Sequence, residues 1–74
     1  MRDARCIEAE RLLAAEGLVG AQVDAAGEAS DIAAIAAAGI ALEQLQALSR
    51  RIKALGFRYV AWTTNSRSDG LEHI

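Results

Sequence analysis

One stretch near the end of the chain marks the passage from a helix to a strand: Lys53-Ala54-Leu55-Gly56-Phe57-Arg58-Tyr59-Val60. Upstream of it, between residues 40 and 55, apolar side chains recur with helical spacing at Ala41, Leu45, Leu48, Ile52 and Leu55. The opposite side of that helix carries Glu43, Gln46, Arg50 and Lys53. Gly56 can adopt the positive φ that ends a helix, and the basic residues suit the negative end of its dipole. The pattern therefore predicts a helix over residues 40–55.

Downstream of Gly56, residues 57–63 have the composition of a strand. Phe57, Tyr59 and Ala61 alternate with Arg58, Val60 and Trp62. Neither set is polar enough for a face in water, so this strand needs cover on both sides. Two helices in so short a chain can cover only one face of a small sheet. We therefore expect the other face to be an exposed apolar patch or an interface.

The N-terminal half predicts a second helix, over residues 3–16. Asp3 can cap its first turn, and Cys6, Ala9 and Leu13 fall on one side of it. Gly17 stands where a left-handed C-cap would. Residues 18–24 alternate like a strand, and residues 25–28 have the composition of a turn.

Two segments are less clear from local pattern. Residues 29–38 are rich in alanine, which favours a helix, with Ser30 or Asp31 as its cap. The same segment fits a second strand in a hairpin with residues 18–24. Residues 64–74 are polar and aperiodic, which is typical of a disordered tail following a single domain over residues 1–63.

Size and composition point to a partner chain. The 74 residues include 17 alanines and only three aromatic side chains, so the core consists mainly of small groups. Small domains of this kind usually need a disulfide, a metal or a second chain for support. A single cysteine cannot form an internal disulfide, and one cysteine with one histidine cannot form a Cys/His zinc site. Because a disulfide and a Cys/His zinc site are excluded, we expect a second protein chain to support the fold.

Charge and hydropathy exclude several classes of function. The net charge of −2 argues against broad nucleic-acid binding. No apolar run approaches 18 residues, so no membrane association is expected. The N-terminal stretch Met1-Arg2-Asp3-Ala4-Arg5 carries an acid and does not resemble a signal peptide. The expected location is the cytoplasm, which also suits a lone cysteine.

No set of residues predicts catalysis. Cys6 lies on the apolar side of a predicted helix, where a cysteine is usually an inert core residue. His73 stands one residue from the end of the polar tail, where nothing would hold a catalytic base in position. No phosphate-binding loop or metal-ligand spacing is present. We therefore expect a protein that is not an enzyme, with no catalytic residue, no cofactor site and no metal site.

One asymmetry of charge supports an alternative function. Residues 50–67 contain five of the eight basic residues and no acid. Next to Phe57, Tyr59 and Trp62, such residues could bind single-stranded nucleic acid by charge and stacking. The candidate contacts are Arg50, Arg51, Lys53 and Arg58. The competing explanation is a basic helix end followed by a core strand, and it is favoured here.

Three segments carry a family resemblance. Residues 53–60 closely match the end of a known domain. Residues 9–17 match the first helix of that domain, and residues 23–27 with 31–35 match its hairpin. On these segments the chain resembles the C-terminal domain of the ATP-dependent sacrificial sulfur transferases (LarE-type) of the PP-loop superfamily. The resemblance implies a strand over residues 29–36. It thus implies an α+β fold, a small αββαβ two-layer sandwich with a three-stranded sheet and two helices on one face.

The resemblance also bears on function. The ATP-binding domain of that family, with its Ser-Gly-Gly-x-Asp-Ser loop, has no counterpart in this sequence, and Cys6 inherits no role. After the last strand, that family continues with an aspartate and a glycine-rich stretch that contains arginine. This chain has Thr63, Thr64 and Asn65 in those places. The domain that remains is implicated in self-association.

The sequence therefore predicts a non-catalytic interaction domain that forms homo-oligomers through its free sheet face. The candidate interface residues are Val60 with Trp62, or else Phe57 with Tyr59. Two alternatives are nucleic-acid binding through residues 50–67 and service as an accessory subunit to a separate PP-loop ATP-binding protein.

Overall fold

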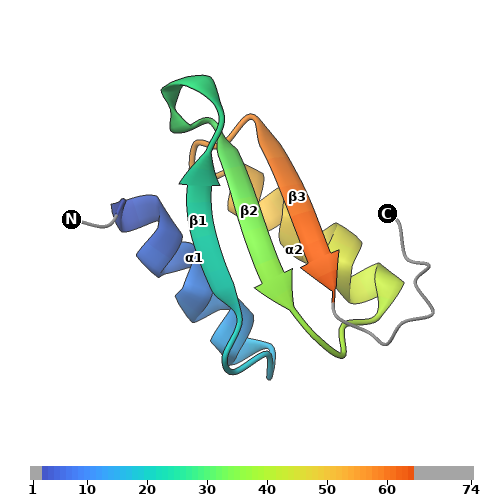
Figure 1. Cartoon of the computed structure of the whole chain (residues 1–74). Coiled ribbons are helices and arrows are strands. Elements are labelled where there is room, and N and C mark those ends of the chain that lie inside the picture. Colours follow the sequence, from blue (N-terminus) through green and yellow to red (C-terminus); the bar gives the residue numbers. More distant parts are fainter. Residues whose placement is uncertain (1–2, 65–74) are drawn as a thin grey trace.

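Two helices lie on one face of a three-stranded sheet in the computed structural model, which describes residues 3–64 (Figure 1). The helices are α1 (Ala4–Ala15) and α2 (Leu42–Lys53), and the strands are β1 (Gln22–Ala26), β2 (Ile32–Ala37) and β3 (Tyr59–Thr64). A short 3-10 turn, η1 (Glu28–Ser30), separates β1 from β2. The predicted αββαβ sandwich is confirmed. The second strand is confirmed as well, in place of the helix that its alanines favour locally.

The sheet is mixed, with β2 in the centre. β1 pairs with β2 antiparallel, from Gln22 opposite Ala36 to Ala26 opposite Ile32. β3 pairs with β2 parallel, from Ile32 beside Tyr59 to Ala37 beside Thr64. Parallel strands need a long crossover, and α2 supplies it between β2 and β3. Both β1 and β3 are therefore edge strands.

The first helix is capped at both ends as predicted. The Asp3 carboxylate accepts a hydrogen bond of 2.8 Å from the Arg5 backbone N–H. At the other end, Gly17 has a φ of 90°, and the Leu18 N–H donates to the Leu13 carbonyl at 2.9 Å. This closure has the form of a Schellman motif.

The prediction of a strand over residues 18–24 is wrong in its first half. The closure at Gly17 turns the chain back, and Gly20, with a φ of 97°, adds a second turn before β1 begins at Gln22. Val19 is consequently 83% exposed. The predicted turn at residues 25–28 is shifted as well, because Ala25 and Ala26 complete β1.

The connection from β1 to β2 is tightly wound. Gly27 has a φ of 83°, and a Cβ at this position would lie 2.8 Å from the Asp31 carboxylate oxygen. Ala29 and Ser30 also have positive φ, at 62° and 56°. Residues 29–31 therefore belong to this turn and not to the strand predicted over 29–36.

The boundaries of α2 and β3 differ slightly from the prediction. Ala41 is the exposed N-cap of α2 and not a member of its apolar stripe, whereas Leu45, Leu48 and Ile52 are buried. β3 begins at Tyr59, two residues later than predicted, and it includes Thr64, which was assigned to the tail. The rest of the predicted tail, residues 65–74, lies outside the described residues.

One hydrophobic core lies between the helices and the sheet. Its largest fully buried side chains are Leu13, Ile35, Leu48, Ile52 and Val23. Cys6 and Ala9 of α1 join them, as predicted from the first helix. Within residues 3–64, neither helix has the length and hydropathy required of a membrane-spanning segment.

Candidate functional site: the free face of the sheet

The sheet has one face without a helix among residues 3–64, here called the free face. Strand alternation assigns its side chains, because Val23, Ala33 and Ile35 are buried under the helices and their neighbours point the other way. The free face comprises Gln22, Asp24 and Ala26 of β1, Ile32, Ala34 and Ala36 of β2, and Tyr59, Ala61 and Thr63 of β3.

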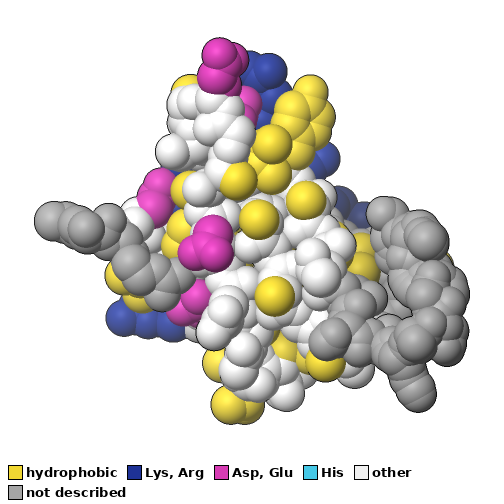
Figure 2. All heavy atoms as spheres, viewed as in Figure 1, with side chains coloured by type: hydrophobic (Ala, Val, Ile, Leu, Met, Phe, Trp, Pro, Cys, Tyr) yellow, Lys and Arg dark blue, Asp and Glu magenta, His cyan; other side chains and the backbone are white. Residues whose placement is uncertain are grey.

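Small apolar groups cover most of the free face. Figure 2 looks onto this face, and its hydrophobic side chains are mostly separate and small, with backbone and polar groups between them. Ala36, Ala61 and Thr63 are exposed, and Tyr59 is 56% exposed. Asp24 is its only charged side chain and lies on the β1 margin. The β2 and β3 part of the free face therefore carries no charge.

The four predicted interface residues do not share one surface. Tyr59 lies on the free face, while Val60 and Trp62 point toward the helices and are half-buried. The Trp62 indole N–H donates to the Ser49 hydroxyl of α2 at 2.7 Å, which holds this ring against the helix. Phe57 precedes β3 and is only 4% exposed, in the core.

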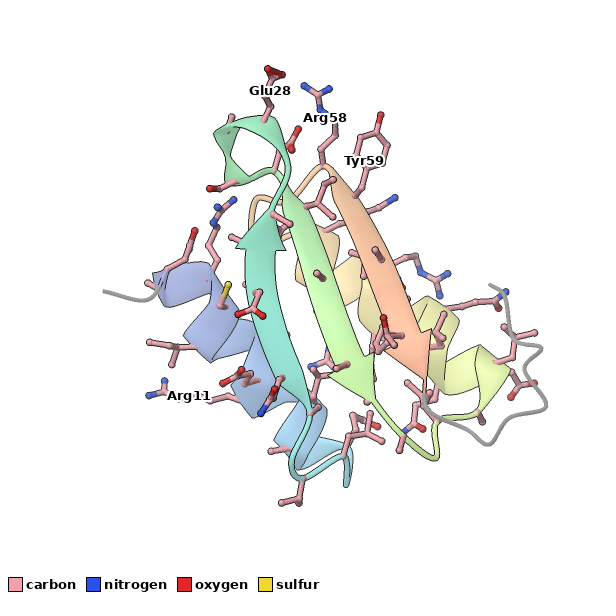
Figure 3. The ribbon with its side chains drawn as sticks, in the orientation of Figure 1. Arg11, Glu28, Arg58 and Tyr59 are labelled. Carbon is pink, nitrogen blue, oxygen red and sulfur yellow. The ribbon has the colours of Figure 1, made fainter. Side chains whose placement is uncertain are left out.

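The candidate nucleic-acid contacts are all exposed, but two of them have acidic partners. Arg51 lies 3.7 Å from the Glu16 carboxylate, and Arg58 lies 3.6 Å from that of Asp31. The Arg58 guanidinium also lies 5.9 Å from the centre of the Tyr59 ring, at the end of the sheet where Figure 3 labels both. Because Phe57, Tyr59 and Trp62 occupy three different environments, they do not form one stacking surface.

Sequence inspection missed Arg5, which makes several polar contacts among the described residues. Its guanidinium donates to the Asp3 carboxylate at 2.6 Å, to the Ser30 carbonyl at 2.9 Å and to the Gly56 carbonyl at 3.1 Å. It also lies 4.1 Å from the centre of the Phe57 ring. Arg5 thereby ties α1 to the turns before β2 and β3. A lone arginine in a helix has no pattern that reveals such distant partners.

Hydrogen bonding to Arg5 lowers the pKa of Asp3 from 3.8 to about 2. A folded-state pKa below the unfolded value stabilises the fold above about pH 4, and this contribution is lost as the pH falls toward 2. We expect the wild-type chain to lose more stability between pH 5 and pH 2 than Asp3→Asn does. Urea unfolding at both pH values measures the difference. Equal losses in the two proteins would contradict the contribution of Asp3.

Two further residues, Cys6 and His73, were considered as candidates for catalysis. Cys6 is buried at 2% exposure in the core. Residues 3–64 contain no cluster of histidine, cysteine, aspartate and glutamate that could hold a metal ion. His73 lies outside the described residues.

No family model, no curated protein and no solved structure matches this chain. A proposal for its function therefore depends on the geometry of the described residues.

Proposed function

We propose that this chain is a small non-catalytic interaction domain that self-associates through the free face of its sheet. The observation that carries the proposal is the uncharged part of that face, formed by β2 and β3. Both helices pack on the opposite side, so no helix within residues 3–64 covers the apolar groups of the free face, and a second copy of the chain can do so.

The side chains of this surface suit the packing of one sheet on another. Ala34, Ala36 and Ala61 are short, so two free faces can approach closely. Ile32 and Tyr59 neighbour each other in the register and supply the larger apolar groups. An aromatic ring with a hydroxyl, such as that of Tyr59, is common at interfaces because one part is apolar and the other can stay hydrated.

The position of Asp24 restricts how two copies can stack. Its carboxylate lies on the β1 margin, so stacking β1 on β1 would bring two like charges together. Stacking β1 of one copy over β3 of the other keeps the two carboxylates at opposite margins. We therefore favour a two-fold axis that runs along the strands.

The alternative functions have less support from the described residues. A nucleic-acid surface would need Arg51 and Arg58 to leave their acidic partners, and it would have only Tyr59 as a well-exposed ring. An accessory role beside a PP-loop ATP-binding protein rests on the resemblance alone.

The variant Ala34→Lys tests the proposal. Ala34 stands in the middle of the free face, directly opposite Asp24 on β1, so a lysine there gains a cross-strand partner in the folded monomer. Burying that charge between two faces is unfavourable, and we expect the dissociation constant to rise at least about ten-fold. Sedimentation over a range of protein concentrations measures it.

Ala15→Lys is the matched control, because Ala15 is exposed in the last turn of α1, where a positive charge is favourable. Its association should equal that of the wild type. A folded wild-type chain that stays monomeric at high concentration would overturn the proposal. Equal association of the two lysine variants would do the same.

A further inference from the structure

The two edges of the sheet differ in how their backbone groups are satisfied. On β1, the Val23 backbone N–H donates to the Glu10 carboxylate of α1 at 2.9 Å. A side chain therefore occupies part of this edge, and Asp24 adds a charge beside it. Natural sheets use such devices to prevent another strand from pairing with an edge.

The edge of β3 has none of these devices among the described residues. Its sequence, Tyr59-Val60-Ala61-Trp62-Thr63-Thr64, contains no charged residue and no proline. Its register with β2 runs without a bulge over its whole length. Apart from β2, no strand within residues 3–64 pairs with it. It is thus an edge strand whose outward backbone groups are not paired by any other strand of residues 3–64.

The hydrogen bonds of β1 show which backbone groups of β3 point outward. The Val23 N–H points away from β2, so the backbone groups that bond to β2 are those of Gln22, Asp24 and Ala26. The backbone groups of the alternate β2 residues therefore point toward β3. In agreement, the Tyr59 N–H donates to the Asp31 carbonyl at 3.3 Å, an acceptor that it shares with Arg58. By alternation, the N–H and C=O groups of Val60 and Trp62 face outward.

We propose that β3 pairs antiparallel with β3 of a second copy of this chain, so that two sheets join edge to edge. A two-fold axis at Ala61 sets Val60 opposite Trp62 of the second copy, and Tyr59 opposite its Thr63. These are pairs of an aromatic with a β-branched side chain, which stabilise neighbouring strands. β3 contains no charged residue, so this register brings no two charges of the strands together.

The charges of α2 favour the antiparallel arrangement. α2 lies behind β3 and contacts it through Ser49 and Trp62 (Figure 1). Its first turn carries Glu43, and its last turn carries Arg50, Arg51 and Lys53. When β3 meets its copy antiparallel, the two α2 helices also run antiparallel, and the acidic end of each lies toward the basic end of the other. Parallel pairing would align like charges.

This contact is distinct from stacking of the free faces and does not depend on it. Pairing at β3 joins the free faces of two copies into one wider face, so both contacts can exist in one assembly. The edge contact can be detected separately, because it changes the hydrogen bonds of the β3 backbone and not the environment of Ala34.

Hydrogen exchange of individual amides, followed by NMR, tests the proposal. The amides of Tyr59 and Ala61 point toward β2 and should be protected at every protein concentration. The amides of Val60 and Trp62 should exchange rapidly in dilute protein and at least about ten-fold more slowly in concentrated protein. Rapid exchange of these two amides at all concentrations would overturn the proposal. It would do so even if a different peptide binds this edge, because the proposal names a second copy of the chain.

A proline variant gives a second test. Val60→Pro removes an outward N–H without removing a bond to β2, and proline is tolerated at such edge positions. The control Val60→Ala loses similar side-chain packing but keeps the N–H. We expect the exchange protection at Trp62 to disappear in Val60→Pro and to persist in Val60→Ala. Protection that persists in both would contradict the edge contact.

The two proposals fail separately. If the free face is not an interface, Ala34→Lys leaves the association constant unchanged while the protection of Val60 and Trp62 still rises with concentration. If the edge contact is absent, the amides of Val60 and Trp62 remain unprotected while Ala34→Lys still weakens association.

Discussion

Ile52→Ala is expected to remove most of the stability of this domain. Ile52 is fully buried in the core between the helices and the sheet. Truncation of a buried isoleucine to alanine costs about 2–5 kcal/mol, from lost apolar burial and from the cavity that remains. A domain of this size has a free energy of unfolding of about 3–9 kcal/mol. If the stability of the wild type lies in the lower half of this range, the variant should be partly unfolded at room temperature.

Urea unfolding followed by the fluorescence of Trp62, the only tryptophan, measures this loss. Leu42→Ala is the control, since Leu42 lies in the same helix but is 59% exposed. It should change the free energy of unfolding by less than about 0.5 kcal/mol. Equal losses in the two variants would show that the core does not lie where the structure places it.

Arg5→Met is expected to give the second largest loss of stability, smaller than that of Ile52→Ala. The variant removes the hydrogen bonds to the Ser30 and Gly56 carbonyls and the contact with the Phe57 ring. Hydrogen bonds from a charged donor contribute more than neutral ones, but Arg5 is 29% exposed, which screens part of the effect. Methionine retains the packing of the side-chain stem.

Two variants separate the geometry of Arg5 from its charge. Arg5→Lys keeps the charge but not the planar fork, so its loss should be about half that of Arg5→Met. Arg11→Met removes an exposed arginine with a single pair to Glu8 at 3.5 Å, and it should have almost no effect. Thermal unfolding of all three variants gives the order. A loss in Arg11→Met as large as in Arg5→Met would contradict the role of Arg5.

The helices were predicted well because their signals are local. The spacing of Leu45, Leu48 and Ile52 within α2 and the cap at Asp3 depend only on residues a few positions apart. The strand boundaries were predicted less well. Leu18 and Val19 have the composition of a strand, but the turns at Gly17 and Gly20 keep them out of the sheet. Local composition does not show which of two overlapping patterns prevails.

The candidate site was predicted only in part. The strand pattern required an uncovered face, and it placed Tyr59 and Ala61 together, as the register does. It could not tell which side of β3 the helices would cover. That choice depends on Trp62 meeting Ser49 across 13 positions of sequence. Phe57 was assigned to the strand, but the chain enters β3 only at Tyr59 and buries the Phe57 ring beneath Arg5.

The sequence by itself determined the two helices, the α+β composition and the expectation of an uncovered sheet face. Each follows from short-range periodicity and from the fact that two helices cover one face of a small sheet. The tertiary structure alone decided the central place of β2, the parallel pairing of β3, the cover of Val60 and Trp62, the closure of the β1 edge by Glu10 and the contacts of Arg5. These features join residues that are distant in sequence. No local pattern encodes them, since each depends on how the packed helices orient the sheet.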